Sequence, residues 1–278
     1  MNPSKVWYVT GASQGLGLIL VKKLLETGYR VAATSRNAQK LKEAISIIDT
    51  ERFLPLAVDL NNPDCIDDSI QQTLKAFGRI DVVVNNAGYG MTGTVEETAE
   101  EDIRKIFEVN VLAPVNVVRM VLPVLRTQRS GYIINIGSVA GLVGAPGWSV
   151  YAATKAAIAA FSEVLALDVK EFGIKVTVVE PSGFRTGFLT ENSLAYAESK
   201  IDGYQSVKET QQRYLAGNGL QPGDPDKASE IIIAMAENQD PPVHLYLGRD
   251  AYSRASGKLA ARMEELETWK STTLSADY

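Results

Sequence analysis

The sequence of 278 residues contains a single cysteine, Cys65, and a single histidine, His244. One cysteine excludes an intrachain disulfide, a CxxC redox pair and a thiolate zinc site, and it fits a reducing, cytoplasmic setting. His244 is remote in sequence from the polar motifs described below, which argues against a Ser-His-Asp hydrolase and favours a structural histidine. No group of histidine, cysteine and carboxylate residues has the spacing of a metal site.

Long apolar runs and an excess of basic residues are also lacking. The stretch V-W-Y-V-T after Lys5 is too short for the apolar core of a signal peptide, and charges or glycine interrupt the other apolar stretches before eighteen residues. The formal charge is -5, with acidic and basic residues interspersed, so no basic face is available for a nucleic-acid backbone. We therefore expect a cytoplasmic protein that binds neither membrane nor nucleic acid.

What the chain does contain is an alternation of short β-branched runs with longer helix-patterned segments. The expected strands cover 6–10, 30–35, 53–58, 80–85, 132–137, 175–180 and 244–247. The expected helices cover 16–27, 37–48, 63–77, 99–126, 150–172 and 225–237. Continuously apolar strands separated by helices are typical of a parallel sheet covered on both faces. The sequence predicts an α/β fold with a doubly wound (Rossmann) sheet of about seven strands.

No repeat, low-complexity tract or Pro/Ser-rich linker divides the chain, so residues 1–278 are expected to form one domain. Residues 186–223 are irregular and rich in Thr, Ser, Asn, Tyr and Gly, and we expect a mobile segment there that covers the substrate site. Residues 251–278 are expected to form a peripheral C-terminal helix, from about 253 to 269, and a tail.

A glycine-rich turn follows the first expected strand. In T-G-A-S-Q-G-L-G (10–17), Gly11, Gly15 and Gly17 stand between that strand and the next helix. Glycine there permits positive φ and close approach of a phosphate to backbone N–H groups, and the helix N-terminus adds partial positive charge. This context predicts a dinucleotide site, although the spacing is G-x-x-x-G-x-G rather than G-x-G-x-x-G. A tight turn without a ligand is the alternative.

The second expected strand ends at Ser35, where NAD-binding proteins usually carry an Asp or Glu for the ribose 2′-hydroxyl. No carboxylate is present to repel a 2′-phosphate, and the guanidinium of Arg36 is suited to bind one. We therefore predict a preference for NADP(H) over NAD(H). The alternative for Arg36 is a surface arginine at the start of a helix.

Further motifs follow in a fixed order along the chain. They are V-D-L (58–60), N-N-A-G (85–88), Asn110, Ser138, Y-A-A-T-K (151–155) and P-S-G-F-R-T (181–186). Together with the glycine turn they resemble the short-chain dehydrogenase/reductase superfamily over roughly residues 5–190. N-N-A-G-Y-G, V-L-P-V-L-R and E-P-S-G-F-R-T are most similar to the branch of bacterial oxidoreductases resembling 17β-hydroxysteroid and retinol dehydrogenases. The resemblance implies hydride transfer between a nicotinamide cofactor and a small-molecule carbonyl or alcohol, but no particular substrate.

Tyr151 and Lys155 lie four residues apart, which places both side chains on one face of a helix. A ketone that accepts hydride also needs a proton, and a cationic Lys155 nearby would lower the phenol pKa from its usual value of about 10. Tyr151 then acts as general acid in reduction and general base in oxidation. Ser138 is expected to donate to the substrate carbonyl oxygen. A packed aromatic ring and a serine that caps a turn are the alternatives.

The resemblance implies roles for the other motif residues. Lys155 would also bind the nicotinamide ribose, and Asn110 would hold a water that links Lys155 to solvent, unless Asn110 is a core amide that bends a helix. Asp59 would reach the adenine amine, and Thr186 the carboxamide or a phosphate. The predicted cofactor-binding residues are Gly11, Ser13, Gln14, Gly15, Leu16, Gly17, Ser35, Arg36, Asp59, Leu60, Asn86, Gly88, Tyr151, Lys155, Pro181, Gly183, Phe184 and Thr186.

One departure from the family pattern concerns Pro181, which is followed by Ser182 where the family usually has glycine. This puts in doubt the local backbone near the nicotinamide. An apolar substrate pocket is a further possibility, and ordinary packing is an equal alternative for its candidate residues. They are Trp148, Phe184, Phe188, Leu189, Tyr196 and Tyr204.

Three functional hypotheses follow. The leading one is an NADP(H)-dependent oxidoreductase for an apolar carbonyl or alcohol, with Asn110, Ser138, Tyr151 and Lys155 as catalytic residues. The second keeps this chemistry with NAD(H), and the third is an NADP(H)-binding sensor or scaffold without turnover. From the family we expect a homodimer or homotetramer, in which the helices near 99–126 and 151–172 pack across a two-fold axis.

Overall fold

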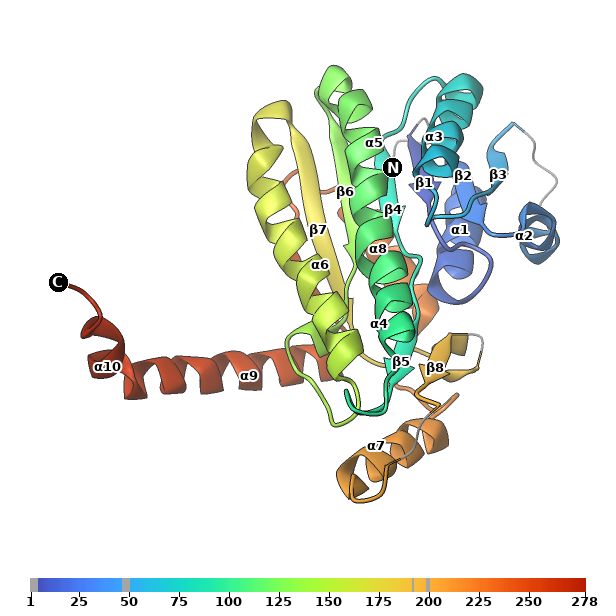
Figure 1. Cartoon of the computed structure of the whole chain (residues 1–278). Coiled ribbons are helices and arrows are strands. Elements are labelled where there is room, and N and C mark those ends of the chain that lie inside the picture. The colour runs from blue at the N-terminus through green and yellow to red at the C-terminus, as the bar shows by residue number, and fades with distance from the viewer. Residues whose placement is uncertain (1–4, 47–50, 192, 199–200) are drawn as a thin grey trace.

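The computed structural model describes residues 5–46, 51–191, 193–198 and 201–278. Seven strands form one parallel sheet in the order β3-β2-β1-β4-β6-β7-β9, and helices cover both of its faces (Figure 1). The strands of this sheet are β1 (Val6–Val9), β2 (Arg30–Ser35), β3 (Phe53–Ala57), β4 (Val82–Asn85), β6 (Gly131–Ile136), β7 (Ile174–Pro181) and β9 (His244–Leu247). The predicted doubly wound fold of about seven strands is confirmed.

The main helices alternate with these strands along the chain. They are α1 (Gly15–Glu26), α2 (Ala38–Ile45), α3 (Pro63–Phe77), α4 (Glu100–Phe107), α5 (Ala113–Gln128), α6 (Ser149–Asp168), α8 (Pro225–Met235), α9 (Arg249–Thr268) and α10 (Lys270–Leu274). Local sequence sets several ends. The Asn62 side chain accepts a hydrogen bond from Asp64 N, Pro63 occupies the first turn, and Gly78 ends α3 at φ 79°. The predicted helix 37–48 ends at Ile45, and residues 47 and 48 lie outside the described chain.

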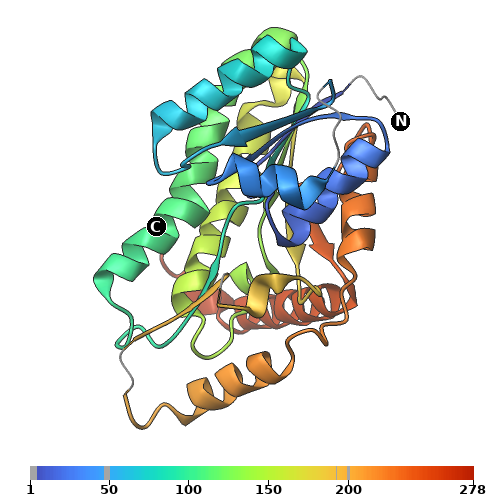
Figure 2. The same ribbon diagram turned by 90° about the vertical axis from the view of Figure 1, so that its right-hand side faces the viewer.

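Successive side chains along each strand pack alternately into two hydrophobic cores, one on each face of the sheet. Trp7 and Val9 of β1 point into the core that α1, α2 and α8 cover, while Val6 and Tyr8 point into the core under α3, α5 and α6. Figure 2 shows the sheet edge-on between these two layers. Each strand is therefore buried on both sides, which explains its continuously apolar sequence.

Residues 186–223 are more regular than expected. They contain the short helix η4 (Gly187–Leu189), strand β8 (Leu194–Tyr196) and helix α7 (Gln205–Ala216), whereas residues 192, 199 and 200 lie outside the described chain. β8 pairs in parallel with β5 (Gly90–Thr92), a strand that the sequence pattern did not predict. Short pairing between segments far apart in the chain leaves no periodicity to detect.

Two helical segments are long and apolar enough to cross a membrane by length and composition, Glu100–Gln128 and Ser149–Asp168. Both pack against the sheet, and Val117, Val121 and Leu165 from them belong to one of its cores. Core helices of this kind also satisfy a test of length and composition. The expectation that the protein binds no membrane stays a prediction.

Candidate active site

A cavity of about 700 Å³ opens along the carboxyl ends of the strands. It spans the point where the strand order reverses between β1 and β4, which is the usual ligand crevice of a doubly wound sheet. Its volume lies within the range of small-molecule and cofactor sites. Of the predicted site residues, all line this cavity except Gly17 and Asn110.

The glycine turn lines one part of the cavity. Gly11 and Gly15 have φ values of 64° and 58°, a region that only glycine occupies readily. A Cβ on Gly11 would lie 2.7 Å from Cα of Ala87, so the turn also packs closely against the segment after β4. The turn thus presents bare backbone at the N-terminus of α1, as phosphate binding requires.

Gly17 does not line the cavity, and its predicted role in cofactor binding stays a prediction. A Cβ on this residue would lie 2.6 Å from the Gly11 carbonyl oxygen and would clash with the Asn86 side chain. Asn86 Nδ2 donates to the carbonyl oxygens of Thr10 and Gly11, each at 3.0 Å. Residue 17 is therefore required to be glycine, because the Asn86 side chain that holds the turn occupies the space where a Cβ would lie.

The end of β2 offers groups for an adenosine ribose. Arg36 is exposed at the rim and makes no hydrogen bond or ion pair with any described residue, and Thr34 Oγ1 is buried without a described hydrogen-bond partner. The Ser35 hydroxyl is used locally, since it donates to the Asn37 carbonyl oxygen at 2.7 Å. Asp59 Oδ1 accepts from Asn61 N at 3.0 Å, which shapes the turn after β3. Arg36 is the free cation among these residues.

Three polar side chains of the predicted catalytic set meet at the middle of the cavity. Tyr151 and Lys155 come from the first turns of α6, and Ser138 follows β6. Lys155 Nζ donates to the Ile136 carbonyl oxygen at 2.8 Å and lies 5.8 Å from the centre of the Tyr151 ring. Ser138 Oγ accepts from Ala140 N at 3.1 Å, so it caps a short helical turn while its hydroxyl proton remains free for another acceptor.

Burial controls the protonation of this pair. It raises the pKa of Tyr151 to about 12, although contact with Ser138 acts in the opposite direction, and it lowers the pKa of Lys155 to about 8. We expected Lys155 to lower the pKa of Tyr151, and the structure gives the opposite direction. The reason is that both side chains are more than nine-tenths buried, and Lys155 Nζ points to a backbone carbonyl rather than to the phenol oxygen. Near neutral pH, Tyr151 is a protonated phenol and Lys155 is cationic.

Asn110 lies behind the cavity wall rather than in it. It is buried in a π-helical turn, η1 (Glu108–Leu112), within the segment that was predicted as continuous helix. Its Oδ1 accepts from Tyr89 N at 3.1 Å, and its Nδ2 donates to the Tyr89 carbonyl oxygen at 2.9 Å and to Thr154 Oγ1 at 3.2 Å. The side chain thus ties the segment after β4 to α6, and its role in the reaction stays a prediction.

The segment after β7 closes the cavity on the other side of α6. Ser182 replaces the usual glycine without strain, because no positive φ occurs at residues 182 or 183. Thr186 lies beside the glycine turn, since a Cβ on Gly15 would be 3.7 Å from Cβ of Thr186. This position favours contact between Thr186 and the phosphates rather than the carboxamide.

An aromatic wall borders Tyr151. Its ring centre lies 5.4 Å from that of Trp148 and 5.9 Å from that of Phe188, and Trp148 in turn lies 5.0 Å from Tyr214. Phe184 and Leu189 also line the cavity as expected, but Tyr196 and Tyr204 do not. Tyr204 instead donates its hydroxyl proton to Glu96 Oε2 at 2.7 Å on the exposed surface.

Several lining residues had no signal in the sequence. They are Tyr89, Val143, Ala145, Leu194, Tyr214, Gln221 and Arg254. Gln221 is buried, and neither polar atom of its carboxamide has a described hydrogen-bond partner. Only Leu194, Tyr214 and Gln221 fall in the segment expected to cover the substrate. The others come from loops and from α9, which only the fold brings together.

His244 lies outside the cavity, as expected for a structural histidine. Its Nδ1 is 2.9 Å from Oε2 of Glu180, which is buried at the end of β7. Burial raises the pKa of Glu180, and the histidine opposes that shift. Among the described residues, no group of three or more His, Cys, Asp or Glu is placed to hold a metal ion.

The cavity fits a nicotinamide dinucleotide. It has a bare glycine turn at a helix N-terminus, and a cationic amine beside a phenol further along. Where a ribose would lie, it has a buried hydroxyl and a guanidinium that have no partner among the described residues. Gly11, Gly15 and Thr186 would hold the phosphates, Thr34 and Arg36 the adenosine ribose, and Lys155 the nicotinamide ribose.

Comparisons with known proteins agree with this geometry. The model of the short chain dehydrogenase family matches residues 5–197. An oxidoreductase of Botryotinia fuckeliana is 35% identical over 98% of this chain and 99% of its own. The 3-ketodihydrosphingosine reductase of Bacteroides thetaiotaomicron is 34% identical over 89% of both chains. The crystal structure of a short-chain dehydrogenase from Streptomyces avermitilis has a TM-score of 0.91 and 36% identity over 99% of both chains.

Solved structures with either nicotinamide cofactor share the fold. A Burkholderia phymatum short-chain dehydrogenase in complex with NAD has a TM-score of 0.80 and 20% identity over 96% of both chains. ElxO with NADP bound has a TM-score of 0.70 and 25% identity, covering 87% of this chain and 95% of its own. The fold therefore does not by itself distinguish NAD from NADP.

Proposed function

Because the chain belongs to the short-chain dehydrogenase family of oxidoreductases, we propose that it interconverts a carbonyl and an alcohol on an apolar small molecule with NADP(H). The observation that carries this proposal is the convergence of Ser138, Tyr151 and Lys155 in the cavity that the glycine turn also lines. A bound nicotinamide supplies or accepts the hydride.

The protein supplies the proton and the electrostatics. In reduction, the Tyr151 hydroxyl transfers its proton to the carbonyl oxygen of the substrate, and its high pKa keeps that proton in place until an alkoxide develops. Ser138 donates a hydrogen bond to the same oxygen. The cationic amine of Lys155 stabilises the phenolate that remains, so the reverse reaction can use Tyr151 as a base.

The preference for NADP(H) is supported by the rim of the cavity. Arg36 has no described partner to compete for it, and no carboxylate stands at the end of β2 to repel a 2′-phosphate. The same chemistry with NAD(H) is the second hypothesis, since proteins that share this fold bind NAD as well as NADP.

An apolar substrate is supported by the aromatic wall around Tyr151. Trp148, Phe188 and Tyr214 offer ring surfaces with few polar atoms near the proton donor. The relative from Bacteroides thetaiotaomicron is by its name a reductase of a keto group on a long-chain lipid base, which agrees with an apolar ketone. We propose a cytoplasmic, homo-oligomeric enzyme without nucleic-acid or membrane partners.

The decisive experiment is a spectrophotometric screen of the purified protein with NADPH or NADH against ketones and aldehydes graded by chain length. We expect NADPH oxidation that improves with apolar chain length. Tyr151→Phe should lower kcat by about 1,000-fold, within the range of general acid catalysis, while NADPH binding measured by fluorescence is retained.

Tyr132→Phe is a matched control. Tyr132 is also buried, and burial raises its pKa to about 12. It lies on β6 outside the cavity, and its hydroxyl donates to Thr177 Oγ1 over a distance of 2.6 Å. Its variant should keep full turnover. Equal activity of Tyr151→Phe and the wild type would refute the mechanism, whereas NADPH binding without turnover of any carbonyl would favour a sensor.

A further inference from the structure

Helix α9 extends from the body of the protein as an arm. Its first turns are anchored, since Ala251 and Ala255 are buried and Arg254 donates to the Val143 carbonyl oxygen at 2.8 Å. Every residue from 256 to 278 is exposed. Figure 1 shows α9 and α10 projecting beyond α6, and Figure 2 shows the same helix running along one end of the molecule. We refer to residues 256–274 as the arm.

The arm continues an apolar stripe that starts near its root. Tyr252, Leu259, Met263 and Leu266 follow one another at intervals of seven, four and three residues, so they lie on one face of the helix. Their exposed fractions are 70%, 48%, 59% and 54%. A single helix without tertiary contacts is only marginally stable in water, and an apolar face of this kind favours burial against a partner.

The charges on the arm indicate what that partner is. The part nearer the root carries Lys258 and Arg262, while the part nearer the tip carries Glu264, Glu265 and Glu267. Lys270 follows these glutamates and pairs with Glu267 at 3.1 Å, so Glu264 and Glu265 carry the net negative charge of the tip. Two copies of this helix in antiparallel orientation place the basic part of one opposite the acidic part of the other. A parallel pair instead places like charges together. The arm is thus complementary to itself about a two-fold axis, as an isologous dimer requires.

A membrane surface fits this pattern less well. Amphipathic helices that bind anionic lipid usually carry basic residues along the whole polar face. Here the three glutamates near the tip would be repelled by anionic headgroups. The self-complementary charge pattern therefore favours a second copy of this chain over a lipid surface.

We propose that α9 is a dimerisation arm, which pairs antiparallel with α9 of a second copy and crosses it near Ala261. In this arrangement Leu259 packs close to Met263 of the partner subunit, and the same contact recurs across the axis. The surface is separate from α5 and α6, the helices that the family resemblance suggested for assembly. The pairing does not depend on the catalytic proposal, because the arm contributes no residue of the predicted catalytic set.

The first test removes the apolar contact. Light scattering after size exclusion gives the mass of the wild type, of the double variant Leu259→Glu and Met263→Glu, and of the control Val95→Glu. Val95 is also an exposed apolar residue, at 63%, but lies outside the arm. We expect the double variant to halve the mass or to weaken self-association by about 100-fold, and the control to have no effect. Unchanged association of the double variant overturns the proposal.

The second test uses charge. One variant carries Lys258→Glu and Arg262→Glu, which leaves Lys270 as the only basic residue of its arm. Another carries Glu264→Lys, Glu265→Lys and Glu267→Lys, which makes its arm basic. Each alone should lose the arm contact by repulsion, and an equimolar mixture should regain it as a heterodimer. Circular dichroism and NADPH binding show that each variant is folded. Failure of the mixture to associate, or a monomeric wild type that binds anionic vesicles through the arm, refutes the pairing.

Discussion

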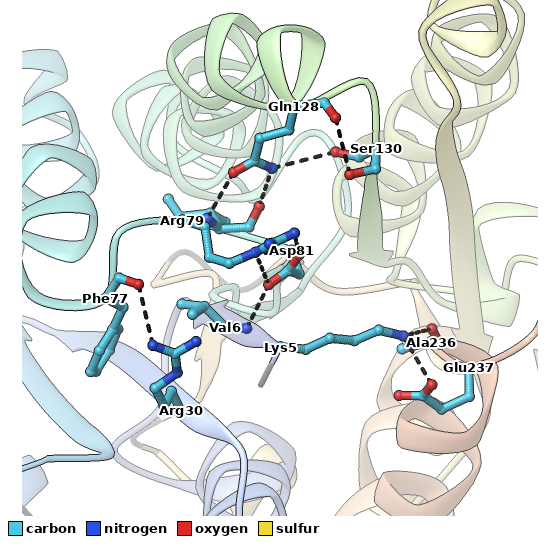
Figure 3. Close-up of polar contacts among 11 residues, drawn as sticks. Lys5, Val6, Arg30, Phe77, Arg79, Asp81, Gln128, Ser130, Ala236 and Glu237 are labelled. Atoms are coloured by element: carbon cyan, nitrogen blue, oxygen red, sulfur yellow. Dashed lines mark hydrogen bonds and ion pairs between the residues drawn. The ribbon is translucent and has the colours of Figure 1, made fainter. Parts of the chain in front are cut away.

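Polar side chains at the two ends of the parallel sheet differ in whether they have hydrogen-bond partners. At the amino ends of β1, β2, β4 and β6, most polar groups bind one another or the backbone (Figure 3). Trp7 Nε1 in β1 is an exception, since it is buried without a described hydrogen-bond partner. Asp81 accepts from Val6 N at 2.8 Å and from the Arg79 guanidinium, and Gln128 bonds both the N–H and the carbonyl of Ile80. Lys5 donates to the Ala236 carbonyl oxygen at 2.8 Å and lies 3.0 Å from Glu237. These contacts fasten the loops that enter the strands.

At the carboxyl ends, several polar groups have no such partner. Thr34 Oγ1, Trp148 Nε1 and both polar atoms of Gln221 are buried without a described hydrogen bond, and Lys155 holds a charge in a buried site. An unsatisfied buried polar group costs about 1 to 3 kcal/mol, and a buried charge costs more. The difference teaches that the amino ends of the strands are built for stability and the carboxyl ends for ligands. Mutations of polar residues at the two ends should therefore change the free energy of unfolding in opposite directions.

The largest effect is expected at Lys155. Lys155→Met should lower kcat/KM by about 1,000-fold because the cation beside Tyr151 is lost, and it should raise the free energy of unfolding by about 2 to 3 kcal/mol because a buried charge is removed. Chemical denaturation and steady-state kinetics measure the two effects. The control Lys175→Met removes a lysine that also donates to a backbone carbonyl, that of Asn238 at 2.7 Å, but near the amino end of β7. Lys175→Met should leave the activity unchanged, and it should not raise the free energy of unfolding.

The same lysine predicts a pH dependence. Its pKa is lowered from 10.5 to about 8, so between these values the unfolded chain binds the proton that the folded protein has lost. The contribution of Lys155 to the free energy of unfolding should therefore increase as pH rises from about 8 to 10.5. Activity that needs the cation should fall above pH 8. Lys155→Met should abolish the first effect in pH-resolved denaturation. A rise of equal size in the variant contradicts the assignment.

The opposite sign is expected at the amino ends. Asp81→Ala removes the acceptor for Val6 N and the carboxylate that pairs with Arg79, and it should destabilise the protein by about 2 to 3 kcal/mol. Turnover per folded molecule should stay at the wild-type value, because the residue is at the far end of the strands from the cavity. Denaturation midpoints and active-site titration separate stability from activity. Loss of kcat without loss of stability contradicts the division between the two ends.

A smaller effect is expected at the rim of the cofactor cleft. Arg36→Asp removes the unpartnered cation and places a carboxylate near the ribose, so it should shift the ratio of NADPH to NADH affinity by about 10- to 100-fold toward NADH. Arg119→Asp is a control for the change of charge at a helical site outside the cavity. The ratio is measured by fluorescence titration, and an unchanged ratio favours the NAD(H) hypothesis.

A larger share of the predicted cofactor residues than of the predicted substrate residues lines the cavity, for a physical reason. The glycine turn, the end of β2 and the Tyr151–Lys155 pair are local: their function follows from a few consecutive residues on one element. All seven sheet strands were predicted close to their observed bounds for the same reason, since each is a short, continuously apolar run.

The remaining parts of the site depend on distant contacts. Asn110 occupies a π-helical turn that has no sequence signature, and its bonds to Tyr89 and Thr154 could not be predicted from the sequence. Tyr214 and Arg254 reach the cavity from α7 and from the root of α9. The direction of the Tyr151 pKa shift was mispredicted because spacing places the lysine on the same face but does not measure burial.

The smallest expected effect tests the link between unpaired groups and ligands. Gln221 is 8% exposed, lies beside Gly183 and lines the cavity with a carboxamide that bonds to no described residue. Gln221→Leu keeps the volume and removes an unsatisfied polar group, so it should raise the free energy of unfolding by about 1 kcal/mol. If the carboxamide serves a bound molecule, the same variant should weaken the binding of NADPH or of the ketone severalfold.

The matched variant Gln128→Leu changes the same residue type at the amino ends, where the carboxamide bonds to Ile80 on both sides. There the substitution leaves a backbone N–H and carbonyl without their partner, so stability should fall while ligand binding stays unchanged. Opposite signs for the two glutamines in one denaturation series sustain the comparison. If both substitutions change the free energy of unfolding in the same direction, the comparison fails. Unpaired polar groups at the carboxyl ends would then not indicate a ligand site any more than paired groups do.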